Sequence, residues 1–219
     1  MIADALKLTV YLGERDRVRG RRLSDVLLEA CERHELRAAV LLRAAEGFGL
    51  DHHLRTNRLL TLSEDLPLVV VAVDERARVE AALPQFADLA GEGLVTLERA
   101  RLLACDLDAP APGTDAKLTL YAGRGDDQRA LVDVLRRYGA AGATVLRGVD
   151  GTPHGERRRA RLLGRGAGVP SLVVSVGDGA AIGRALPELG RRMGRPLATL
   201  ERVTILDGQR RPPATGGRS

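Results

Sequence analysis

Apolar and polar residues alternate near the start of the chain, and the same alternation returns in its second half. In the first segment every second residue is apolar: Leu6, Leu8, Val10 and Leu12. This period of two predicts a strand with one buried face. Apolar residues at helical spacing over 23–31 then predict a helix. Strands over 38–45, 68–73 and 94–103, with a second helix capped by Asp74 before the last of them, complete the order β-α-β-β-α-β.

The second half of the chain repeats this plan. Three blocks recur in the same order: KLTVYLG at 7–13 as KLTLYAG at 117–123, AVLLR at 39–43 as ATVLR at 143–147, and TLER at 96–99 again at 199–202. The separation between matching blocks falls from 110 to 104 residues after the first strand, so the second unit lacks six residues there. Asp126 or Asp127 is placed to cap the first helix of the second unit. We interpret the chain as a duplication.

The repeated order predicts an α+β fold with two tandem ferredoxin-like βαββαβ domains, each an antiparallel four-stranded sheet with two helices on one face. The expected boundaries follow composition: a first domain at 1–105, a Pro-rich linker at 106–115, a second, diverged domain at 116–207 and a disordered tail at 208–219. The helices would leave the other face of each sheet bare. Because oligomerisation usually covers such a face, we expect a homotrimer with its domains in two stacked rings.

Charge and composition restrict the class of partner. The chain has 34 Lys and Arg residues against 29 Asp and Glu residues, and the two signs are interspersed, as on a solvated mixed-charge surface. Only Tyr11 and Tyr121 are aromatic residues on predicted strands, whereas RNA-recognition sheets stack bases on two or three per domain, so we expect no nucleic-acid partner. Cys31 and Cys105 match no metal spacing and predict buried free thiols. With no signal peptide and no apolar run of about 20 residues, we expect a cytoplasmic protein.

Long polar loops follow the second strand of each unit. The first contains a histidine pair and two arginines, and the second contains an arginine cluster: His52, His53, Arg55, Arg58, Arg157, Arg158 and Arg159. Loops of this length are often functional, so we assign these residues to partner-contacting loops, with a solvated hairpin extension as the alternative. Arginines suit a phosphate or an acidic partner. Adjacent histidines on an extended segment point apart, which is poor geometry for a metal, and we expect no metal site.

The Gly-Glu-Gly sequence at 91–93 joins the second helix to the last strand of the first unit. Two glycines there let backbone N–H groups approach an anion, and the alternative is a helix C-cap followed by a turn. The sequence contains no Walker A, GxGxxG, GxSxG or HExxH motif, and no Ser-His-acid set or close carboxylate pair stands out. We therefore expect no catalytic residues and no enzyme activity.

Four segments in order resemble one family: LTVYLGE at 8–14, RAAEGFG at 43–49, LSEDLP at 62–67 and GEGLVT at 91–96. The family is the bacterial and archaeal domain of unknown function one-nine-zero, which is similar to the PII nitrogen-signalling proteins. The resemblance implies ferredoxin-like domains in trimers, an adenine nucleotide bound between subunits, and a loop from Glu46 to about Leu60 that engages a transporter or an enzyme. It also implies ligand-binding residues in two glycine motifs: Gly47, Phe48, Gly49, Gly91, Glu92 and Gly93. Leu94 stands where PII proteins carry a lysine.

Together these features predict a non-enzymatic PII-like signalling protein. A small metabolite, with an adenine nucleotide as the candidate, would bind at a subunit interface and bias the order of the loop after the second strand. One alternative is a scaffold that contacts a membrane transporter through its loops without a ligand. Another is a metal-binding protein of the divalent-ion tolerance type, with His52 and His53 as its candidate residues.

Overall fold

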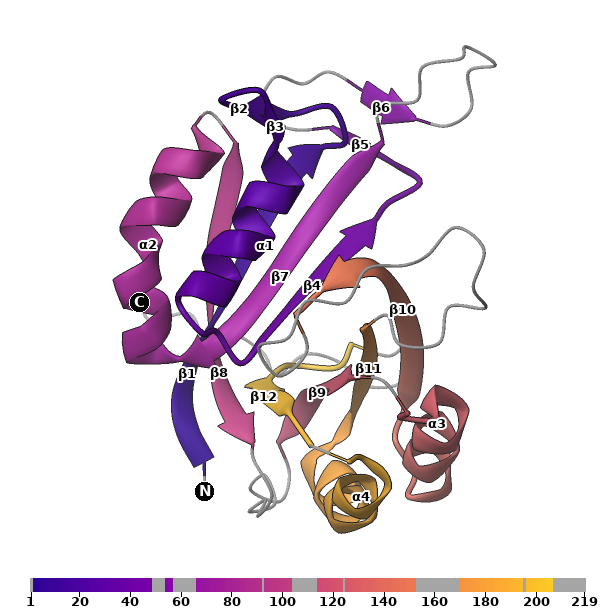
Figure 1. The fold of residues 1–219 in the computed structure, drawn as a ribbon. Coiled ribbons are helices and arrows are strands. Elements are labelled where there is room, and N and C mark those ends of the chain that lie inside the picture. Colours follow the sequence, from indigo (N-terminus) through magenta and orange to yellow (C-terminus); the bar gives the residue numbers. More distant parts are fainter. Residues whose placement is uncertain are drawn as a thin grey trace, which may run out of the picture.

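The computed structural model describes residues 2–48, 54–56, 66–91, 93–103, 114–123, 125–152, 170–194 and 196–206 (Figure 1). The main elements of the first half are β1 (Ile2–Gly13), α1 (Leu23–Arg33), β4 (Ala38–Arg43), β7 (Pro67–Glu75), α2 (Arg76–Ala90) and β8 (Leu94–Leu103). Two short hairpins lie between them: β2 (Arg17–Val18) with β3 (Arg21–Arg22), and β5 (Glu46–Phe48) with β6 (Leu54–Thr56). The second half contains β9 (Asp115–Ala122), α3 (Gln128–Arg137), β10 (Gly142–Gly151), β11 (Ser171–Asp178), α4 (Gly179–Arg192) and β12 (Ala198–Arg202).

The eight long strands form one closed barrel in the order β1-β7-β4-β10-β11-β9-β12-β8. Every neighbouring pair in it is antiparallel. The prediction of two tandem ferredoxin-like domains, each with its own four-stranded sheet, is therefore wrong. The physical reason is that the outer strands of each half offer unpaired backbone groups, and these pair with the other half of the chain instead of remaining sheet edges.

Two seams join the halves, and both pair strands that occupy equivalent places in the repeat. At one seam β8 pairs with β12, with Leu102 opposite Thr199. At the other seam β4 pairs with β10, with Leu42 opposite Gly148 and a break in register before Asp150. Each strand therefore meets its own counterpart, as at the two-fold interface of a homodimer.

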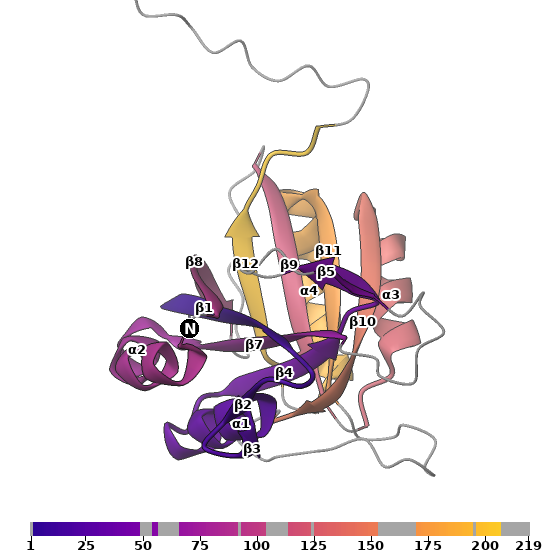
Figure 2. The same ribbon diagram turned by 90° about the horizontal axis from the view of Figure 1, so that it is seen from above.

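Three hydrophobic clusters hold the barrel. The first lies between α1, α2 and the strands of the first half and includes Leu8, Leu27 and Phe86. The second lies between α3, α4 and the strands of the second half. The two helix pairs thus cover opposite outer sides of the barrel (Figure 2). The third cluster fills the barrel interior with side chains from both halves, among them Val40 and Leu172.

The barrel interior explains what covers the faces that the helices leave bare. Each half covers the other, so the apolar surface that motivated oligomerisation is buried within one chain. The homotrimer stays a prediction, but an exposed apolar sheet face is no longer a reason to expect it. The boundaries at 105–106 and 115–116 also stay predictions, and most of the linker and all of the tail at 208–219 lie outside the described residues.

A row of charges also lies inside the barrel. Lys7 Nζ is 2.6 Å from Glu98 Oε2 and 3.2 Å from Glu201 Oε1, and Lys117 pairs with Glu201 as well. The side chains of Lys7 and Glu201 are only 12% and 11% exposed. Because Lys7 belongs to the first half and Glu201 to the second, this ion pair crosses between the halves.

The helix caps differ between the halves. Asp127 accepts hydrogen bonds from the N–H groups of Arg129 and Ala130 at 3.0 and 3.1 Å, which confirms the predicted cap of α3. The predicted cap of α2 is wrong, because the N-cap is Glu75, without a side-chain cap bond. Asp74 is fully buried and instead accepts from the backbone N–H and Nε of Arg37 at 3.0 and 3.1 Å. Arg37, in the turn between α1 and β4, therefore binds the Asp74 carboxylate, which does not cap α2.

Replacing Asp127 by alanine is expected to lower the free energy of unfolding by about 1 kcal/mol, because the first turn of α3 loses the acceptor for two N–H groups. Urea unfolding followed by circular dichroism measures the change. The control is Asp133→Ala on the same helix, where a surface carboxylate is lost and the change stays within about 0.5 kcal/mol. Equal losses in both variants would contradict a capping role.

Cys31 is buried and free, as predicted, and burial raises the pKa of its thiol to about 12. The thiol therefore stays protonated at neutral pH and is a poor nucleophile. Cys105 lies outside the described residues. No helix within the described ranges combines the length and the apolar character that crossing a bilayer requires.

Candidate functional site

A tight turn follows the first strand of each half. In the first half, the N–H of Gly13 donates to Asp16 Oδ2 at 2.7 Å, and the N–H of Asp16 donates back to the Gly13 carbonyl at 3.2 Å. In the second half, Gly123 and Asp126 form the same pair of bonds, at 2.8 and 3.4 Å. The duplicated sequence therefore folds into the same local structure twice.

The halves diverge directly after this turn. In the second half, Asp127 caps α3 at once. In the first half, the chain first forms the β2–β3 hairpin, which reverses at Arg19 and Gly20 with φ of 49° and 78°. The hairpin accounts for the six residues that the second unit lacks, and it carries arginines at four of its six positions. A basic element is thus present in one copy only.

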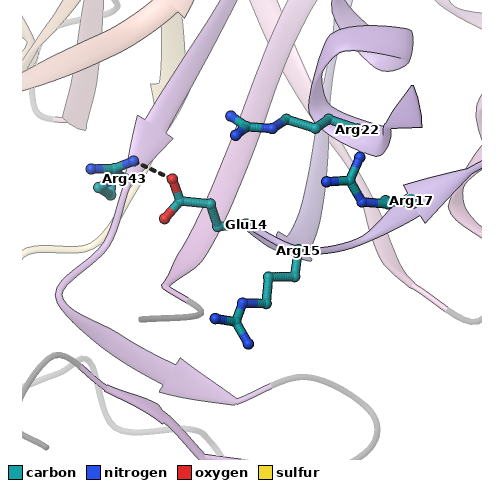
Figure 3. A pocket seen from close by; sticks show the side chains of 5 residues that line it. All are labelled: Glu14, Arg15, Arg17, Arg22 and Arg43. Atoms are coloured by element: carbon teal, nitrogen blue, oxygen red, sulfur yellow. Dashed lines mark hydrogen bonds and ion pairs between the residues drawn. The ribbon is translucent and has the colours of Figure 1, made fainter. Parts of the chain in front are cut away.

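The hairpin forms one wall of a pocket of about 400 Å³, which we call the arginine pocket. The described residues that line it come from the turn, the hairpin and the end of β4: Glu14, Arg15, Arg17, Arg22 and Arg43. Four guanidinium groups and one carboxylate give a formal excess of three positive charges. Figure 3 shows these side chains around one space, with the Glu14 carboxylate directed at Arg43.

The contacts inside the arginine pocket leave much of its charge accessible to solvent. Arg43 forms an ion pair with Glu14, and their side chains are 47% and 23% exposed. Arg17 Nη1 donates to the carbonyl of Gly20 at 3.3 Å, which uses one of its five N–H groups. Guanidinium groups bind phosphate and carboxylate groups through pairs of parallel hydrogen bonds. The site is therefore suited to an anionic ligand.

The arginine pocket lies at the root of the long loop predicted to contact a partner. The N–H of Glu14 donates to the Leu66 carbonyl at 2.9 Å, where the chain returns from the loop. The N–H of Ala44 donates to the Pro67 carbonyl at 2.9 Å, where the chain leaves for it. Both ends of the segment 44–66 therefore meet beside Glu14 and Arg43, at the end of the barrel that carries β2, β3, β5 and β6 (Figure 1).

The predicted glycine positions have structural roles in the described residues. A Cβ on Gly47 would lie 3.3 Å from Pro67 Cγ, so glycine lets β5 approach β7 closely. Gly91 ends α2 with φ of 55°, and its N–H donates to the Ala87 carbonyl at 3.2 Å. The N–H of Gly93 donates to the Ala90 carbonyl at 2.7 Å. Because helix carbonyls already accept from both N–H groups, this turn has the geometry of a helix end, and its role in ligand binding stays a prediction.

Several other predicted site residues cannot be placed. Gly49, His52, His53, Arg58, Glu92, Arg157, Arg158 and Arg159 lie outside the described residues, and only the backbone is described at Phe48 and Arg55. Within the described ranges, no three His, Cys, Asp or Glu side chains are grouped as a metal site. The structure instead brings together arginines that the sequence did not single out. The sequence feature that could have revealed them is the segment 17–22, which only the first unit contains and in which four of six residues are arginines.

A sequence profile of one family matches both halves of the chain, over residues 5–102 and again over residues 117–205. The family is DUF190, described as "Uncharacterized ACR". The chain belongs to this family. The match confirms the resemblance to the domain of unknown function one-nine-zero.

Three solved structures are weakly similar to the chain. An unknown protein from Galdieria sulphuraria is 13% identical with a TM-score of 0.28, over 93% of this chain and 100% of that one. A candidate glycine cleavage system transcriptional repressor is 11% identical with a TM-score of 0.27, over 92% and 98%. A candidate monooxygenase from Fusobacterium nucleatum is 9% identical with a TM-score of 0.28, over 94% and 95%. At these TM-scores the similarity does not bear on fold or function.

Proposed function

We propose that the protein is a non-enzymatic regulatory protein that binds an anionic metabolite in the arginine pocket and signals through the segment 44–66. The observation that carries this proposal is the convergence of four arginines from three elements at the root of that segment. A polyanion would draw these guanidinium groups together, and a change at the root would alter the order of the loop. The partner would then bind one of the two loop states better than the other.

The finer parts of the proposal concern the ligand and the partner. An adenine nucleotide is the candidate ligand, because its phosphates match the charge of the arginine pocket and the family resembles the PII proteins. The candidate partner is a membrane transporter or channel that contacts the loop. The ligand site of this proposal lies within one half of one chain, so it needs no subunit interface.

Isothermal titration calorimetry with ATP, ADP, AMP and cyclic AMP tests the proposal. We expect binding that weakens as phosphates are removed, because fewer charge-assisted hydrogen bonds form. The absence of any binding heat with all four nucleotides and with inorganic pyrophosphate would contradict the proposal. Partner capture that is the same with and without nucleotide would favour the ligand-independent scaffold.

The substitution Arg22→Ala is expected to weaken nucleotide binding about 10- to 100-fold, because a hydrogen bond to a charged group contributes about 1.5–3 kcal/mol. Arg21→Ala is the matched control. Arg21 precedes Arg22 on β3, carries the same charge, pairs with Glu29 of α1 and does not line the pocket. Equal losses in the two variants would show that only net charge matters, and would place the ligand elsewhere.

A further inference from the structure

We propose that Glu14 acts as the resident anion of the arginine pocket, and that a phosphate-bearing ligand binds by displacing its carboxylate from Arg43. This displacement of the Glu14 carboxylate by the ligand connects ligand binding to the segment 44–66. This inference rests on the proposed function, because it assigns a switch to the same site.

Glu14 differs from the other described residues that line the arginine pocket, because it alone carries negative charge. Its carboxylate contacts Arg43, the last residue of β4. Without a ligand, the carboxylate neutralises one guanidinium group and limits the repulsion among the four. A ligand that uses Arg43 must therefore compete with Glu14.

Glu14 also touches the other end of the long segment. Its side chain holds Arg43, directly before the segment begins, and its backbone N–H donates to Leu66 at the end of the segment. The backbone of Arg43 is fixed, because β4 pairs there with Leu68 of β7. When the Arg43 side chain turns to a ligand, the freed Glu14 carboxylate must find solvent or another cation. The displacement thus acts at the point where both ends of the segment are joined.

The competition also defines the chemical class of the ligand. A monocarboxylate would only replace one carboxylate on Arg43 with another, and the intramolecular one has the advantage of being tethered. A phosphate dianion has more charge and three acceptor oxygens, so it can accept from Arg43 and from a second guanidinium group at once. The arginine pocket should therefore select phosphates, alone or in phosphoesters, over carboxylates.

The experiment compares wild-type protein with Glu14→Gln in titrations with inorganic pyrophosphate, ATP and citrate. Glutamine keeps the size of the side chain and removes the competing charge. We expect pyrophosphate and ATP to bind about tenfold more tightly to Glu14→Gln, because they no longer compete with the Glu14 carboxylate for Arg43, and we expect citrate to bind more weakly than pyrophosphate to both proteins. The control is Glu29→Gln, which removes a carboxylate from Arg21 outside the arginine pocket and should leave all affinities unchanged.

Hydrogen exchange provides a second measurement that does not depend on affinity. We expect peptides that contain Glu14 and Ala44 to exchange faster in ligand-free Glu14→Gln than in ligand-free wild type, and ATP should accelerate them in wild type. Equal or weaker binding to Glu14→Gln, or unchanged exchange, would overturn the role of Glu14 while nucleotide binding by wild type still supported the proposed function. If neither protein binds pyrophosphate or ATP, both proposals fail.

Discussion

Replacing Gly148 by valine is expected to destabilise the protein by about 3 kcal/mol, because the substitution blocks a seam of the barrel. Gly148 lies on β10 opposite Leu42 of β4, where the two halves join. A Cβ at this position would lie 2.4 Å from the Pro170 carbonyl oxygen and 2.9 Å from Val40 Cγ1. The backbone must therefore move before any side chain fits, and the N–H of Gly148 would lose its 3.0 Å bond to Pro170.

Urea unfolding of the full chain measures this effect, and hydrogen exchange in β4 and β10 locates it. The control is Gly190→Ala in α4, where nothing lies within 4 Å of the added Cβ. Alanine there should stabilise the helix by about 0.5–1 kcal/mol, since glycine is a poor helix former. A loss near zero for Gly148→Val, with unchanged exchange in β4, would mean that the two halves do not close into one barrel.

Replacing Glu201 by glutamine is expected to cost about 2 kcal/mol at neutral pH, because it removes one partner from the partly buried row of charges inside the barrel. Glu201 accepts from Lys7 at 3.2 Å and also pairs with Lys117. A charge that loses its partner in a buried site destabilises by about 3–5 kcal/mol, and the loss is smaller here because Lys7 keeps Glu98.

The pH dependence of this effect follows from Lys7. Burial on its own lowers the pKa of the ammonium group, but the ion pairs with Glu98 and Glu201 outweigh burial, and the pKa of Lys7 is raised above its usual 10.5. Because the folded-state pKa lies above the unfolded value, the pairs stabilise fully below about pH 10.5, and the stabilisation is lost as the pH rises through the folded-state pKa.

The matched control for Glu201→Gln is Glu80→Gln, which breaks an exposed i,i+4 pair with Arg76 on α2. Exposed pairs contribute less than about 0.5 kcal/mol and are weakened by salt. We therefore expect the loss at Glu201 to persist in 0.5 M salt and the loss at Glu80 to vanish, because dissolved ions screen the exposed pair much more than the partly buried one. Equal and salt-sensitive losses would show that water solvates the charges inside the barrel.

Only part of the candidate site could be predicted from the sequence. The glycine motifs and the loop were recognisable from the sequence because they are local, and the family match supports the resemblance on which they rest. The arginine pocket was not predicted, because Arg22 and Arg43 are 21 positions apart and meet only when α1 has folded between them. The neighbouring residues in the sequence do not distinguish these arginines from ordinary surface arginines.

Helix and strand periodicity, together with the repeat, predicted the four helices and the eight long strands but neither of the short hairpins, β2–β3 and β5–β6. The face of β9 that packs on α3 and α4, with Leu118 and Leu120, follows from a period of two, because alternate side chains must point to opposite sides of a strand. What covers the other face does not follow from that period. Free strand edges pair with any compatible strand, and only the folded chain shows that β4 meets β10, that β8 meets β12 and that Lys7 reaches Glu201. These contacts depend on the geometry of closing eight strands, which is a property of the whole chain and of no single segment.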